Sequence, residues 1–69
     1  MPTQAIESEA IEAVDYDPWS EILRVTFRNG QSYEYLGVPP KEFRNFMNAE
    51  SRGAYMNQVI KRRYKWRKV

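Results

Sequence analysis

Apolar and polar side chains alternate along the first half of the chain, which is the pattern of strands that bury one face. A turn at residues 17–20, with its proline, divides two such stretches, and residues 32–36 form a third. The apolar rows of the first two stretches are Ile11, Val14 and Tyr16, then Leu23, Val25 and Phe27. This periodicity predicts three consecutive strands, with Asn29-Gly30 closing a hairpin between the second and third.

The length of that hairpin loop decides where two tyrosines lie. A two-residue loop at 29–30 places Tyr33 and Tyr35 on the face opposite the apolar row. A three-residue loop, with Gly30 left-handed in a bulge, pairs Val25 with Tyr33 and Leu23 with Tyr35 on one face. We favour the second register, because a domain this small can hardly leave both rings outside.

The second half of the chain has helical spacing. Two prolines at 39–40 suit a helix start, and an apolar stripe follows at Phe43, Phe46 and Met47. Ser51 is a plausible N-cap for a second helix running from Arg52 to about Tyr64. The core positions of that helix are Tyr55, Met56, Val59 and Ile60.

These elements predict an α+β domain: a three-stranded antiparallel sheet followed by two C-terminal helices packed on one face. Residues 10–64 form the domain. We expect residues 1–9 to be a loose N-terminal arm and residues 65–69 a basic C-terminal tail.

Composition excludes several kinds of chemistry. The 69 residues include no His and no Cys, so the usual zinc and haem ligands, Cys–His nucleophiles and disulfides are absent. The carboxylates do not cluster. Asp15 and Asp17 flank Tyr16, but polar residues of this kind are common next to a turn. We therefore expect no enzyme, no metal, no cofactor and no small-molecule substrate. Without a signal peptide or a long apolar run, we expect a cytoplasmic protein with no membrane partner.

Charge is distributed unevenly along the chain. The first 60 residues carry nine acids against five bases, whereas the last nine carry six bases and no acid. Cations and rings alternate there, which suits a nucleic-acid strand that offers phosphates and base faces together. The candidate binding residues are Lys61, Arg62, Arg63, Tyr64, Lys65, Trp66, Arg67 and Lys68. Trp66 would lie outside the core on a frayed end, where its indole could stack on a base or on the body of the protein.

The same segment has a simpler interpretation. A solvated basic tail would offset an acidic domain, or pair with Glu7, Glu9 and Glu12 at little gain in stability. Trp19, beside the proline of the first turn, is either a lid over the edge of the core or an exposed contact ring.

Two further groups of residues could meet anions. Ser51, Arg52 and Gly53 open a helix, with Asn57 one turn on, so this end could hold a phosphate, although capping and tight packing explain the same residues. Arg24 and Arg28 lie on the predicted outer face of the sheet, where they could meet phosphates or simply be hydrated.

The joint order of these pieces resembles the KTSC domain, a short module named for its occurrence at the C-terminus of some lysyl-tRNA synthetases and found also as small bacterial proteins. The resemblance covers most of the chain and ends at Tyr64, so 65–69 inherit nothing from it. It implies no determined function; RNA binding has been suggested for the family because of its attachment to a tRNA-handling enzyme. The residues that carry it are Tyr16-Asp17-Pro18, Ser20, Leu23, Val25, Phe27, Gly30, Tyr33-Glu34-Tyr35, Val38-Pro39, Phe43, Ala49, Ser51-Arg52-Gly53-Ala54-Tyr55, Asn57, Ile60, Arg62 and Tyr64.

The sequence thus predicts a small non-enzymatic nucleic-acid-binding module that contacts phosphates through its basic C-terminal helix and tail. RNA, possibly tRNA, is favoured over DNA. The alternative is a protein-protein interaction module that uses an exposed sheet edge or the acidic N-terminal arm.

Overall fold

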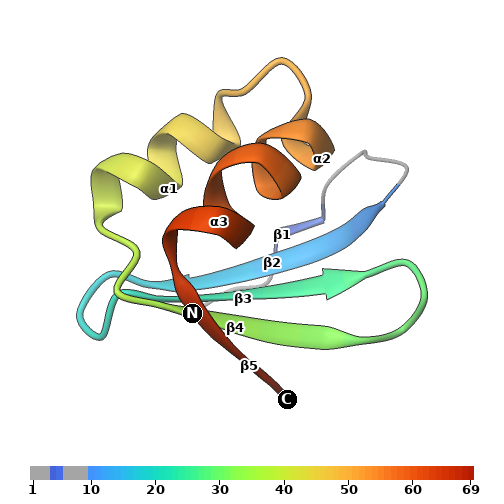
Figure 1. Cartoon of the computed structure of the whole chain (residues 1–69), viewed down its shortest axis with the longest axis horizontal. Coiled ribbons are helices and arrows are strands. Elements are labelled where there is room, and N and C mark those ends of the chain that lie inside the picture. Colours follow the sequence, from blue (N-terminus) through green and yellow to red (C-terminus); the bar gives the residue numbers. More distant parts are fainter. Residues whose placement is uncertain (1–3, 6–9) are drawn as a thin grey trace.

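The computed structural model describes residues 4–5 and 10–69 and contains one antiparallel sheet with helices on one side (Figure 1). The three central strands are β2 (Ile11–Asp17), β3 (Ile22–Phe27) and β4 (Ser32–Leu36). They are the three alternating stretches of the sequence, and each pairs with its neighbour along the chain. The α+β class and the antiparallel sheet are therefore confirmed.

The sheet has five strands, so the prediction of three is wrong. Both ends of the chain add a strand: β1 (Gln4–Ala5) pairs with β2, and β5 (Lys65–Lys68) pairs with β4. β5 includes four of the five residues expected to form a tail. Gln4 and Ala5 belong to the expected N-terminal arm, and the remainder of that arm, at 1–3 and 6–9, lies outside the described residues.

The β3–β4 hairpin has the three-residue loop. The Phe27 amide donates to the Gln31 carbonyl at 2.8 Å, and the Gly30 amide donates to the Phe27 carbonyl at 2.9 Å. Gly30 has φ +90°, a conformation that glycine adopts without steric cost. Val25 therefore stands opposite Tyr33, and Leu23 opposite Tyr35, which confirms the favoured register.

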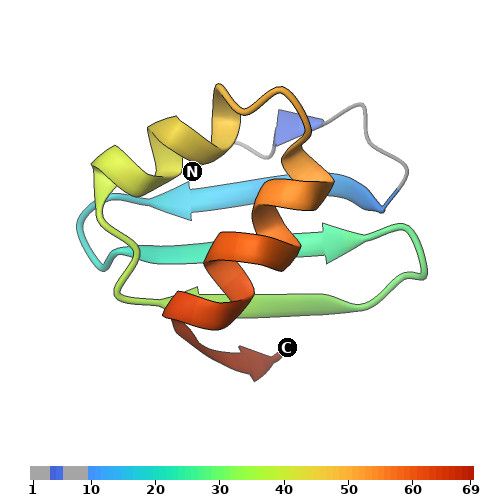
Figure 2. The same cartoon turned by 45° about the horizontal axis from the view of Figure 1, so that its top comes forward.

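The helical half begins with α1 (Pro40–Met47), as the prolines predicted. A second helical run contains α2 (Arg52–Tyr55), a π-helical turn η1 (Met56–Ile60) and α3 (Lys61–Arg63). Ser51 caps this run, because its hydroxyl accepts from the Ala54 amide at 3.3 Å. Figure 2 shows the run crossing the sheet diagonally. Tyr64 ends it with extended backbone angles, φ −116° and ψ 145°, and directs the chain into β5.

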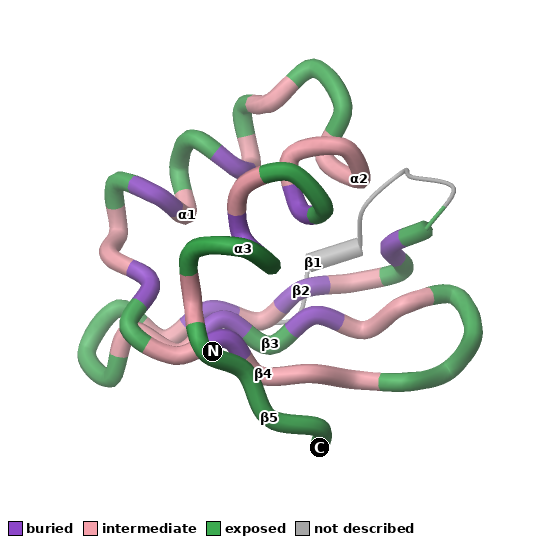
Figure 3. Tube along the Cα trace, viewed as in Figure 1, coloured by how far each residue is buried: buried purple, intermediate pink, exposed green. Residues whose placement is uncertain are grey.

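The core lies between the helices and the sheet (Figure 3). Tyr35 is 2% exposed, so its interpretation as a core residue is confirmed, and the Tyr16 hydroxyl donates to the Val38 carbonyl at 2.6 Å. The Tyr16 ring stacks on Phe43, with the ring centres 4.3 Å apart. The buried apolar residues are Ile11, Val14, Tyr16, Leu23, Val25, Tyr35, Val38, Phe46, Met56 and Ile60.

No helix in the part of the chain that the structure describes is long and apolar enough to cross a membrane. Among residues 4–5 and 10–69, no group of three or more acidic side chains is placed to hold a metal ion.

Candidate nucleic-acid interface

The basic segment 61–68 divides between two elements, because the chain turns from α3 into β5 at Tyr64. Because β5 pairs with β4, each side chain of β5 is assigned to one face of the sheet. Trp66 stands opposite Tyr35 and Lys68 opposite Tyr33, so both lie on the helix side of the sheet. Lys65 and Arg67 alternate with them and lie on the outer face. The frayed end predicted for Trp66 is therefore wrong, although the side chain is still 57% exposed.

Arg63 is used within the fold. Its guanidinium donates to Glu42 on α1 at 2.7 Å, and the Tyr55 and Tyr64 hydroxyls donate to the same carboxylate, which is 5% exposed. Burial alone would raise the pKa of Glu42, but the two tyrosine hydrogen bonds and the Arg63 charge outweigh it and hold the pKa below its usual value. This cluster joins α1 to the second helical run, so Arg63 serves the structure.

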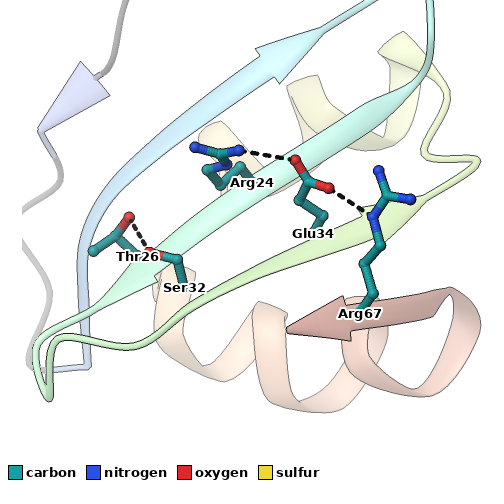
Figure 4. Close-up of polar contacts among 5 residues, drawn as sticks. All are labelled: Arg24, Thr26, Ser32, Glu34 and Arg67. Carbon is teal, nitrogen blue, oxygen red and sulfur yellow. Dashed lines mark hydrogen bonds and ion pairs between the residues drawn. The ribbon is translucent and has the colours of Figure 1, made fainter. Parts of the chain in front are cut away.

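Arg67 is paired as well, in a row of charges across the outer face of the sheet (Figure 4). Its Nε donates to Glu34 at 2.7 Å, and Arg24 donates to the other oxygen of the same carboxylate at 3.1 Å. The hydrogen bond from Arg67, followed by that from Arg24, lowers the pKa of Glu34 despite partial desolvation. Arg24 therefore lies on the outer face as predicted, but its charge is partly compensated there by Glu34, which it shares with Arg67.

Arg28 does not join Arg24 on that face. It belongs to the hairpin loop, where its amide donates to the Ala10 carbonyl at 2.9 Å, and it is among the residues that line an aromatic groove. The spacing of two residues suggested a shared face, but the strand ends at Phe27 and the loop redirects the chain.

The side chains of three cations in the segment have no ion-pair or hydrogen-bond partner in the described part of the chain: Arg62, Lys65 and Lys68. Lys61 is exposed, and its ammonium lies 5.1 Å from the centre of the Phe27 ring, a cation–π distance that leaves its charge uncompensated. Four positive charges thus remain available at this end of the molecule.

An aromatic groove of about 540 Å³ has Lys61 in its lining. Its rings form a chain of edge-on contacts: Phe27 and Tyr33 have centres 5.8 Å apart, and Tyr33 and Trp66 have centres 5.3 Å apart. The full lining is Ala10, Phe27, Arg28, Asn29, Gln31, Tyr33, Tyr35, Lys61 and Trp66. The sequence pattern did not predict this groove, because its rings come from three different strands. The three-residue loop, which pairs Phe27 with Gln31, was the one feature that indicated that Phe27 and Tyr33 share a face.

The predicted anion site at the start of the second helical run has local uses for its polar groups. The Ser51 hydroxyl caps the helix, and the Arg52 Nε donates to the Met47 carbonyl at 3.0 Å. Gly53 lies in the first turn and Asn57 is exposed. Anion binding there stays a prediction, and the capping role of Ser51 is confirmed.

Trp19 is 95% exposed in the turn between β2 and β3, so it does not act as a lid over the core. Its amide donates to the Asp17 carboxylate at 2.9 Å, which fixes the turn and lowers the pKa of Asp17. This turn joins β2 to β3, whereas the groove lies at the β3–β4 hairpin, so Trp19 does not line the groove.

Comparison with known proteins establishes the family. The sequence model of the KTSC domain matches residues 7–64. The chain is a KTSC domain. A crystal structure of a KTSC domain protein from Yersinia pestis superimposes with a TM-score of 0.93 at 38% identity, covering 99% of this chain and 96% of that one.

KTSC relatives occur both alone and within a larger enzyme. A protein of Tsukamurella paurometabola is 44% identical over 90% of this chain and 92% of its own length. The lysine–tRNA ligase of Nostoc punctiforme is 32% identical over the whole of this chain, which spans 12% of the ligase. The similarity to the ligase therefore includes residues 65–69, beyond the end of the family model.

Proposed function

We propose that this KTSC domain is a non-enzymatic module that binds single-stranded nucleic acid, RNA in preference to DNA, through the cations around β5. The observation that carries the proposal is the arrangement of Lys61, Arg62, Lys65 and Lys68 beside an exposed tryptophan. Arg63 and Arg67, which sequence reasoning placed in the same group, act within the fold and contribute less.

Electrostatics support this assignment. The four cations have no carboxylate partner among the described residues, so binding a polyanion would not require breaking an ion pair. Neutralised phosphates release counterions, which favours association and makes it dependent on salt. The relationship to a lysine–tRNA ligase is consistent with RNA as the ligand, possibly tRNA.

Salt dependence tests the proposal. Labelled single-stranded RNA, tRNA and duplex DNA are titrated with the protein over a range of salt concentrations, and binding is followed by fluorescence anisotropy. Four neutralised phosphates predict a slope of log K against log salt of about −3 for a single strand. Flat, weak binding to all three probes would overturn the proposal.

A matched pair of variants locates the surface. Lys65 and Lys68 are replaced by Ser in one protein, and Lys41 and Arg44, which are exposed on α1, are replaced by Ser in the other. Both proteins lose the same charge. The β5 variant should lower the magnitude of the slope by about 1.4, whereas the α1 variant should leave it near the wild-type value. Equal effects of the two variants would mean that net charge alone governs binding.

A protein-interaction module is the second candidate, and one observation favours it. β5 is the last strand of the sheet order and is exposed along its length, so one edge is open to pairing with an extended peptide (Figure 3). Such a complex, held mainly by backbone hydrogen bonds and apolar contacts, should show little salt dependence, and the same titrations with peptides distinguish the two candidates.

A further inference from the structure

The groove between Lys61 and the β3–β4 hairpin has the features of a site for one base. We propose that it binds a single unstacked nucleobase of the bound strand, stacked against Trp66, with the flanking phosphates at Lys61 and Lys68. This inference rests on the proposed function and adds which part of the nucleic acid enters the protein and where.

The rings of the groove leave an aromatic surface open. Trp66 contacts Tyr33 edge-on, with an angle of 83° between the ring planes, and 57% of the Trp66 side chain is exposed. Tyr33 in turn contacts Phe27 at 69°. An edge-on contact with Tyr33 covers at most one face of the indole, so a base could cover the other face. The volume of about 540 Å³ lies in the range that accepts a small ligand.

Cations lie on both sides of these rings. The Lys61 ammonium lies over Phe27 at one side, and Lys68 stands opposite Tyr33 in the β4–β5 register, on the same face as the groove. No carboxylate is among the described residues that line the groove. Positive charge beside open rings matches a nucleotide, whose anionic phosphate and flat base occur together.

Two side-chain amides at the hairpin supply hydrogen-bond donors for the edge of the base. The Asn29 amide oxygen accepts from the Gln31 backbone amide at 2.9 Å, and the Gln31 amide oxygen accepts from the Tyr33 hydroxyl at 2.9 Å. Both amide oxygens are therefore engaged. The nitrogens of the two amides remain to donate to a carbonyl or ring nitrogen of a base.

The outer face of the sheet lacks this combination. Its arginines, Arg24 and Arg67, share Glu34, and the nearby hydroxyls of Thr26 and Ser32 bond to one another at 3.0 Å (Figure 4). Each of these arginines is partly compensated by Glu34 and attracts a polyanion less than an uncompensated cation at the groove does. The groove side is therefore the side on which the base would bind.

The test distinguishes binding of the base from binding of the sugar-phosphate backbone of the RNA. In a Trp19→Phe background, where Trp66 is the remaining tryptophan, the protein is titrated with a single-stranded RNA and with an abasic ribose-phosphate strand of equal length. Stacking predicts that the RNA quenches Trp66 fluorescence and binds about tenfold more tightly than the abasic strand. A Trp66→Leu variant should lose about tenfold in RNA affinity, Trp66→Phe should retain most of it, and the exposed control Trp19→Leu should match the wild type.

The possible outcomes distinguish a failure of the base site from a failure of the proposed function. Equal binding of the two strands with unchanged Trp66 emission would overturn the base site, while a surviving salt slope would leave the proposed function standing. Absence of salt-dependent binding to both strands would overturn the proposed function and the base site together. Preferential quenching of Trp66 by an acidic peptide would assign the groove to a protein partner instead. Circular dichroism and thermal melting establish that each variant is folded.

Discussion

The Arg63 guanidinium donates to the Glu42 carboxylate over 2.7 Å, so one cation of the basic segment holds α3 against α1. Tyr55 and Tyr64 donate to the same carboxylate, which is nearly inaccessible to solvent. A buried carboxylate is stable only when it is hydrogen-bonded, and here three donors satisfy it. This relationship explains why a charge cluster that looks uniform in sequence contains residues with different roles.

Removal of the Glu42 carboxylate should destabilise the domain. Glu42→Ala leaves the Tyr55 and Tyr64 hydroxyls without their acceptor, and we expect a loss of about 2 kcal/mol or more in the free energy of unfolding. Urea denaturation followed by circular dichroism measures the change. Glu50→Ala, at an exposed position, is the control and should have little effect. Equal stability of the two variants would contradict the structural role of Glu42.

Stability should fall in acid. The pKa values of Glu34 and Glu42 are held below their usual value of 4.5, so the stability that these groups contribute is complete above about pH 4.5 and is lost as the pH falls through their folded-state values. Urea midpoints measured across this range should decline below about pH 4.5, and Glu42→Gln should make the decline shallower. A midpoint independent of pH in this range would be inconsistent with these pKa shifts.

The tyrosines predict that the stability of the domain also falls at high pH. The pKa values of Tyr16, Tyr35 and Tyr64 are raised above 10.0, chiefly by burial, and that of Tyr55 chiefly by its hydrogen bond to Glu42. Their contribution is therefore present below about pH 10 and lost as the pH rises through the folded-state values. Absorbance titration of phenolate formation should show these four groups ionising later than free tyrosine. Ionisation of all five tyrosines at the free value would contradict the burial described here.

Glu34 should limit nucleic-acid affinity, because its single negative charge partly compensates Arg24 and Arg67. Glu34→Gln frees these two cations, and we expect tighter binding of single-stranded RNA and a salt slope steeper by about 1. Stability should change little, since both arginines are about half exposed. Glu50→Gln makes the same change in net charge on an exposed loop and serves as the control. An identical effect of the two substitutions would show that Glu34 has no local influence.

β5 should contribute to stability through its backbone and Trp66. Ending the chain after Tyr64 removes the pairing with β4 and the contact with Tyr33, and we expect the melting temperature to fall by about 5 to 15 °C. Replacement of Lys65, Arg67 and Lys68 by Ser keeps the strand and should lower the melting temperature by only a few degrees. Scanning calorimetry measures both. A truncated protein as stable as the full chain would show that β5 adds nothing to the fold.

The β3–β4 loop depends on Gly30. Its φ of +90° is costly for other residues, whereas a Cβ at this position would meet no atom within 4 Å. Gly30→Ala should therefore lose about 1 to 2 kcal/mol through the backbone alone. Gly30→Asn should lose less, since asparagine tolerates positive φ better. Chemical denaturation measures the difference, and an alanine variant equal to the wild type would exclude this loop geometry.

Local patterns of residues were enough to predict most elements of the fold. Alternation specified β2, β3 and β4, two prolines specified the start of α1, and Ser51 specified the cap of the second helical run. The size of the chain selected the three-residue loop, because burying Tyr35 required that register. The order of these residues also identified the KTSC family.

The conformation of the basic C-terminal end depends instead on contacts between segments that are distant in sequence. Residues 65–68 have no alternation of apolar and polar side chains, and they form β5 because the open edge of β4 offers them hydrogen-bond partners. Arg63 pairs with Glu42 and Arg67 with Glu34, at separations of 21 and 33 residues. Ion pairs and ring contacts between segments distant in sequence follow from how strands and helices are placed, and no local period encodes that placement.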